Sequence, residues 1–96
     1  MGNLNVEKQL KKFFSPQELK EIELMSFEAI VKSAMEGNSK AQFQLGSFYF
    51  LGKYLKKNME RAFYWFDKSA EQGDIQATEV LKLWIEELNQ QRSTKK

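Results

Sequence analysis

The chain has 96 residues, of which 42% are hydrophobic and 29% are charged, with a formal net charge of +2. That length suits one domain, and so small a charge disfavours a protein held mainly by nucleic-acid phosphates. Cysteine and histidine are both absent, which excludes disulfides, thiolate zinc sites and the commonest general base. No apolar run could span a bilayer, so we expect a cytoplasmic protein without membrane contact, metal or cofactor.

The N-terminal residues 1–25 predict two helices. The first covers residues 4–14, where apolar and charged side chains recur at helical spacing. The second is expected to begin at Pro16, because Ser15 before it and a glutamate three residues later form a capping box. The residues leave open whether a helix over 16–36 is continuous.

From Ser26 onward the chain repeats itself with a period of 36 residues. The pattern Lys-Ser-Ala-x-x-Gly at 32–37 recurs at 68–73, and each copy is followed by an alanine and then a leucine. Both glycines stand where a helix end requires a left-handed residue. The repeat predicts four helices, at residues 26–36, 39–51, 59–72 and 75–90, and a loop over 52–57 that is bounded by Asn58 as the N-cap of the next helix.

Two runs of spaced residues define the middle of the chain: Ala41-x-x-x-Leu45-Gly46-x-x-Tyr49-x-x-Gly52, and then Ala62-x-x-Trp65-x-x-Lys68-Ser69-Ala70-x-x-Gly73. Together they resemble a Sel1-like repeat over residues 39–73, with partial repeats on both sides. The resemblance implies an all-α fold, a short α-solenoid of antiparallel helix pairs related to the tetratricopeptide fold. About five or six helices would build it.

Three positions depart from the family pattern. Tyr54 stands where the family commonly has a second loop glycine, Ser69 replaces an alanine, and Lys82 replaces a glycine. The last departure favours the final helix as a cap, and the N-terminal helices are expected to form the other cap. The expected organisation is therefore N-terminal capping helices over 1–25, a repeat region over 26–88 and a polar tail over 89–96.

The predicted helix 39–51 is apolar on two opposite faces. One face forms the core of the helical hairpin, and the other carries Phe43, Ser47 and Phe50. Two interpretations remain open for this second face. Either the N-terminal helices cover it, or Phe43 and Phe50 are aromatic anchors for a protein or peptide on a concave surface.

The apolar stripes of the last two helices predict the rest of the core. In helix 59–72 this stripe consists of Met59, Ala62, Phe63, Phe66, Ser69 and Ala70. In helix 75–90 it consists of Ala77, Val80, Leu81, Trp84 and Leu88.

Candidate surface residues concentrate in the loop and at the start of the helix after it. The loop combines lysines with a tyrosine, so it is either a solvated edge, a site for an acidic partner, or a nucleic-acid site over 53–61. Tyr64 falls among charged residues and is either an ordinary exposed tyrosine or an interface residue. The candidate protein-binding residues are Phe43, Ser47, Phe50, Lys53, Tyr54, Lys56, Lys57, Arg61 and Tyr64.

The family resemblance implies a non-catalytic protein–protein interaction module, an adaptor or scaffold. The sequence is consistent with a non-catalytic role, because it contains no nucleophile–base arrangement and no phosphate-binding loop. One repeat builds a small surface, which predicts one protein or peptide partner, acidic where it meets the lysines, or a homo-oligomer. The alternative is a small immunity protein or inhibitor that neutralises a toxin, and nucleic-acid binding is a weaker alternative.

Overall fold

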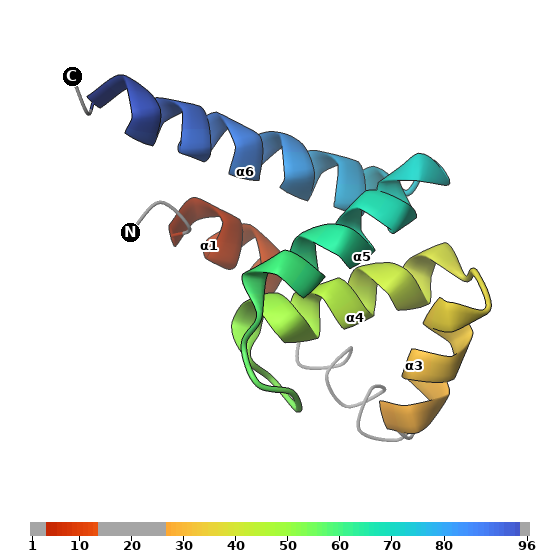
Figure 1. The fold of residues 1–96 in the computed structure, drawn as a ribbon. Helices are drawn as coiled ribbons and strands as arrows, with labels where there is room; N and C mark the ends of the chain where they lie inside the picture. The colour runs from red at the N-terminus through yellow and green to blue at the C-terminus, as the bar shows by residue number, and fades with distance from the viewer. Residues whose placement is uncertain (1–3, 14–26, 95–96) are drawn as a thin grey trace.

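The structure is a computed structural model, and it describes residues 4–13 and 27–94 (Figure 1). The helix expected from Pro16, with its capping box and its continuation toward residue 26, lies outside these ranges. Within them the chain is all α-helical and forms no strand. The helices are α1 (Leu4–Phe13), α3 (Phe27–Met35), α4 (Ser39–Leu51), α5 (Met59–Glu71) and α6 (Ile75–Thr94).

The helix boundaries follow the repeat closely. α4 begins and ends where predicted, and α5 and α6 begin where predicted. The main difference is that α6 continues to Thr94, into the segment 89–96 that was expected to be a tail. That segment is polar, but it contains neither glycine nor proline, and its glutamines and arginine are good helix formers. Polarity alone therefore did not end the helix.

The turns after α3 and α5 have the same construction. Gly37 and Gly73 adopt φ angles of +104° and +91°, as predicted for helix C-termini. The backbone N–H groups of Asn38 and Asp74 then donate to carbonyls five residues earlier, at 3.0 and 3.3 Å. Their side chains accept a hydrogen bond from the N–H three residues later, at 2.8 Å in both turns. Each polar residue thus ends one helix and caps the next.

The helices α3 to α6 form an antiparallel array, in which each packs against its neighbour along the chain (Figure 1). α1 was expected, with the rest of 1–25, to cap the end opposite helix 75–90. Instead α1 contacts α6 and α4, and it lies at the other end of the molecule from α3. The first described helix therefore covers the end of the array that is most distant from it in sequence.

The close approach of α4 and α5 explains Gly46. A Cβ atom at this position would lie 2.8 Å from Phe66 Cδ1 and 3.2 Å from the carbonyl oxygen of Ala62. Glycine in a helix interior costs about 0.5–1 kcal/mol relative to alanine, which the packing of these two helices offsets. The equivalent position on α6 is Lys82, which is exposed, so packing does not demand a glycine there.

Two apolar clusters occupy the two faces of α4. The central cluster lies toward α1, α5 and α6, and it contains Val6, Leu10, Phe43, Phe50, Ala62, Phe66, Ala77, Val80, Leu81 and Trp84. The α3 cluster lies toward α3, and it contains Ile30, Ala34, Ala41, Leu45 and Phe48. The prediction of a buried Trp84 is confirmed, since its ring meets that of Phe50 edge-on at 5.0 Å.

Two residues expected in the core are exposed, and this part of the prediction was wrong. Phe63 is exposed although its ring lies 5.5 Å from that of Trp84. Leu88, one helical turn after Trp84, is exposed as well. Neither residue belongs to the two apolar clusters of the described chain.

Candidate protein-binding surface

The second face of α4 is covered. Phe43, Ser47 and Phe50 are all buried, and Val6 and Leu10 of α1 belong to the same central cluster as the two phenylalanines. The Ser47 hydroxyl donates to the Phe43 carbonyl at 2.8 Å, so its polar atom is satisfied within the helix. The interpretation of these three residues as accessible anchors is therefore wrong for the folded chain, because α1 and the neighbouring helices bury them.

Tyr54 has an unusual backbone conformation in the loop after α4. Its φ angle is +67°, a left-handed value that costs a non-glycine residue about 1–2 kcal/mol. This is the position where the Sel1-like pattern has a glycine. The Tyr54 ring meets that of Phe48 edge-on at 5.2 Å and lies 6.2 Å from that of Phe27, yet Tyr54 remains 48% exposed. Its ring thus covers the edge of the α3 cluster.

The cations of the loop are on the surface. Lys53, Lys56 and Lys57 are all exposed, and Lys53 Nζ lies 5.6 Å from the centre of the Tyr54 ring. Asn58 closes the loop, because its N–H donates to the Tyr49 carbonyl at 3.0 Å while its side chain caps α5. The loop is therefore held at its end against α4 and presents its charges outward.

α5 continues the same combination of aromatic rings and cations. Arg61 is exposed, donates to the Tyr49 hydroxyl at 3.2 Å and lies 5.8 Å from the centre of that ring. Tyr64 is 53% exposed, meets the ring of Trp65 edge-on at 5.1 Å and has Lys68 Nζ 5.3 Å from its ring centre. The predicted exposure of Tyr64 is confirmed. The two cations of α5, Arg61 and Lys68, each lie over an aromatic ring.

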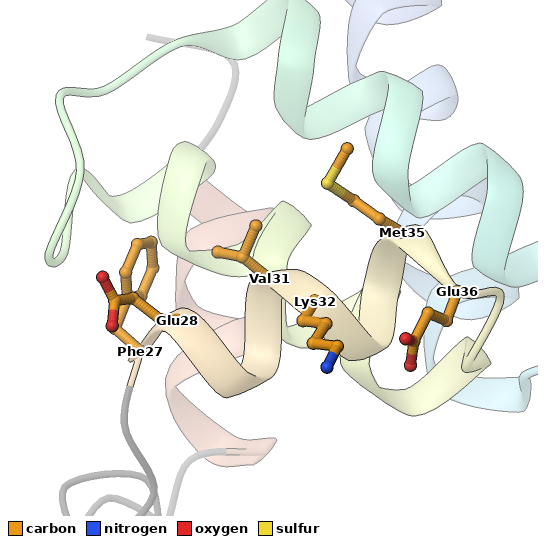
Figure 2. A pocket seen from close by; sticks show the side chains of 6 residues that line it. All are labelled: Phe27, Glu28, Val31, Lys32, Met35 and Glu36. Atoms are coloured by element: carbon orange, nitrogen blue, oxygen red, sulfur yellow. The ribbon is translucent and has the colours of Figure 1, made fainter.

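An apolar hollow lies on α3, and it was not predicted from the sequence (Figure 2). Its volume is about 440 Å³, and Phe27, Val31 and Met35 supply its apolar lining. Val31 and Met35 point to the same side of α3, whereas Lys32 points away (Figure 2). Met35 is 73% exposed. The spacing of four residues between these apolar side chains was the available signal.

The contact between Phe27 and Tyr54 joins the hollow to the loop. Tyr49 and Trp65 pack against the same α3 cluster as Phe27 and Val31. We therefore treat the exposed and half-buried residues around this cluster as one surface. The aromatic–basic surface consists of Phe27, Val31, Met35, Lys53, Tyr54, Lys56, Lys57, Arg61, Tyr64 and Lys68.

The described residues contain no group of three or more His, Cys, Asp or Glu side chains that could hold a metal ion. None of the helices in residues 4–13 and 27–94 combines the length and apolarity needed to cross a membrane. The surface around the α3 cluster offers aromatic area, methionine and positive charge, with the exposed carboxylates of Glu28 and Glu36 also lining the hollow, and such groups recognise another molecule by contact.

Comparison with known proteins supports the resemblance drawn from the repeat. The chain is 40% identical over 57 residues to the chitin synthase regulator SKT5 of Saccharomyces cerevisiae, which covers 59% of the chain and 8% of that protein. It is 42% identical over 47 residues to a putative sel1-like repeat-containing protein of Acanthamoeba polyphaga mimivirus, covering 49% of the chain and 8% of the relative. The chain thus spans less than a tenth of either relative.

No solved structure matches the chain significantly. The model of the Sel1 repeat family matches residues 39–74, which are α4, α5 and the turns that follow them. Proteins with this repeat generally mediate protein–protein interaction and are generally non-catalytic. Residues 39–74 therefore match the Sel1 repeat, and α4 and α5 of the α3 to α6 array lie within the match.

Proposed function

We propose that this chain is a non-catalytic adaptor that binds one protein partner on the aromatic–basic surface. The observation that carries the proposal is the left-handed backbone conformation of Tyr54, at a position where glycine would be free of strain. Backbone strain of this kind persists where the side chain has a use. Burial of the Tyr54 ring explains only part of that use, since half of the residue remains open to solvent.

The composition of the surface defines the expected partner. Tyrosine, arginine and methionine are enriched in protein interfaces, and the cations Lys53, Lys56, Lys57 and Arg61 favour acidic side chains. We expect a partner with an apolar side chain that enters the α3 hollow and carboxylates that meet the loop. Such an interface keeps the rings central and the charges at the rim, where salt weakens but does not abolish binding.

Site-specific photo-crosslinking in native lysate tests the proposal. A photoreactive phenylalanine analogue replaces Tyr54 or Tyr64 in two separate variants, and Glu86 in a control variant, because Glu86 is exposed on α6 away from the surface. We expect the same protein to be crosslinked from positions 54 and 64 and absent from the control. Equal crosslinking from all three positions, or none, would contradict the proposal.

The identity of the crosslinked partner separates the alternatives. A toxin whose activity falls when the chain binds it would make the chain an inhibitor rather than an adaptor. A product that contains a second copy of the chain would indicate a homo-oligomer. Nucleic acid in the product, with a steep loss of binding as salt rises, would assign the loop to phosphate contacts. We propose the cytoplasm as the place of action, which fractionation would test.

A further inference from the structure

The face of α4 and α6 that α1 covers has the properties of a binding site. α1 lies along α6 and contacts α4 (Figure 1). Val6 and Leu10, one helical turn apart, are fully buried in the central cluster with Phe50 of α4 and Trp84 of α6. α4 and α6 form this α1-covered face, and α1 lies outside the residues 39–74 that match the Sel1 repeat, as α6 does.

The α1-covered face also carries a charge that suits the beginning of a helix. Glu87 is only 8% exposed, and its Oε2 accepts a hydrogen bond from the backbone N–H of Asn5 at 3.3 Å. Its buried Oε1 has no hydrogen-bond partner in the described part of the chain. The first N–H groups of a helix lack partners and carry the positive end of the helix dipole. Glu87 is therefore placed to receive a helix N-terminus.

The contact that α1 makes is of the kind that helical peptides make in a hydrophobic groove. Among the α1 side chains that the structure describes, Val6 and Leu10 enter the core, while Lys8, Lys11 and Lys12 are exposed. The ion pair of Lys11 with Glu7, at 3.2 Å, lies within α1 and does not attach it to α6. Among the described contacts, those of Val6 and Leu10 with the central cluster and of the Asn5 N–H with Glu87 hold α1 in place.

We propose that α1 is an exchangeable occupant of the α1-covered face, and that an amphipathic helix of a partner protein binds there in its place. The partner helix would carry apolar residues four positions apart, as Val6 and Leu10 are, with its N-terminus at Glu87. A second copy of the chain that placed its own α1 there is the competing occupant, and the test below distinguishes it. The proposal does not rest on the function proposed for the aromatic–basic surface.

A peptide with the sequence of residues 1–14, labelled at its C-terminus, tests the proposal by fluorescence anisotropy against the full chain. The variant V6D/L10D cannot bury its own α1, so it should bind the peptide at least tenfold more tightly than the wild type. The matched control K8D/K12D places aspartates on the exposed side of α1 and should behave as wild type. A peptide carrying V6D/L10D should not bind any of these chains.

Further variants locate the binding. Substitution E87Q in the V6D/L10D chain should weaken peptide binding about two- to fivefold, since it removes the charge that faces the helix N-terminus. Substitution Y54A in the same chain should leave peptide affinity unchanged, which separates this site from the aromatic–basic surface. A V6D/L10D chain that keeps its helical circular dichroism but does not bind the peptide would overturn the proposal.

Hydrogen exchange of the wild-type chain tests whether the peptide displaces α1, even if V6D/L10D does not fold. A saturating excess of the peptide should raise the exchange rate of the α1 backbone amides, because the peptide displaces α1. Unchanged α1 exchange would overturn the proposal. Dimers of the wild-type chain that disappear on addition of the peptide would also overturn it, since they would show that a second copy supplies the helix.

Discussion

The two apolar faces of α4 carry similar side chains but have different covers. On the side of the central cluster, α1, α5 and α6 bury Phe43 and Phe50 completely. On the side of the α3 cluster, α3 covers Phe48 of α4. Two residues of α3 itself remain open to solvent, Phe27 partly and Met35 largely. In an array with one complete repeat, the helices outside that repeat therefore decide which face is available to another molecule.

Substitution W84A should break the central cluster and have the largest effect. Deleting a buried tryptophan costs about 3–5 kcal/mol, because it removes apolar contact and leaves a cavity. Urea denaturation measures the change in the free energy of unfolding. The comparison is W65A, whose side chain is only partly buried beside the α3 cluster and should cost less. Equal losses for the two variants would mean that the clusters are equally important to stability.

Substitution G46A should act on the contact between α4 and α5, on which both clusters depend. Alanine normally stabilises a helix interior relative to glycine, but here its Cβ would clash with the Phe66 ring. We expect a loss of about 1–3 kcal/mol. The free energy of unfolding lost through G46A should be smaller in an F66L background than in the wild type, since the smaller leucine side chain can give way. Additive losses in this double-mutant cycle would exclude the clash with the Phe66 ring as the cause and leave the Ala62 carbonyl oxygen as the obstacle.

Substitution N58A should loosen the loop between α4 and α5, which lies beside the α3 cluster. The Asn58 side chain accepts a hydrogen bond from the Arg61 N–H at 3.0 Å, and loss of such a cap costs about 1 kcal/mol. The matched variant N38A removes the equivalent cap of α4 and should cost about the same in thermal unfolding. Only N58A should also weaken partner binding, because the loop carries the lysines of the aromatic–basic surface.

Substitution Y54G should have the smallest effect on stability and a large effect on binding. Glycine relieves the left-handed strain while the contact of the ring with Phe48 is lost, so the free energy of unfolding should stay within about 1 kcal/mol of wild type. Capture of the crosslinked partner should fall sharply. Retained binding by Y54G would remove Tyr54 from the interface, and a large loss of stability would show that the ring serves mainly the fold.

Much of the array could be predicted because local chemistry determines it. Gly37 and Gly73 end helices, and Asn38, Asn58 and Asp74 begin them, so that boundaries follow from residues that are close in sequence. The pairing of α4 with α5 follows from the period of the repeat and from the spacing of its small residues.

The covers of the two faces could not be predicted from local patterns. Phe43 and Phe50 have the same periodicity whether a helix of the same chain or a partner covers them. The burial of Glu87 depends on its contact with Asn5, which is distant in sequence. The exposure of Phe63 and Leu88 depends on which helices pack against α5 and α6. The strain at Tyr54 had a signal, the missing loop glycine, but its φ angle required the structure.

The hydrogen bond between Asn5 and Glu87 joins residues 82 positions apart in the chain. A helical array with contacts only between sequence neighbours has low contact order and can begin folding at any point. The docking of α1 adds a long-range contact to such a fold. On the ribosome, where N-terminal segments emerge first, α1 leaves the exit tunnel before α6 exists. α1 is therefore synthesised before the helix on which it docks, and Val6 and Leu10 lack their native contacts with α6 until that helix has been made.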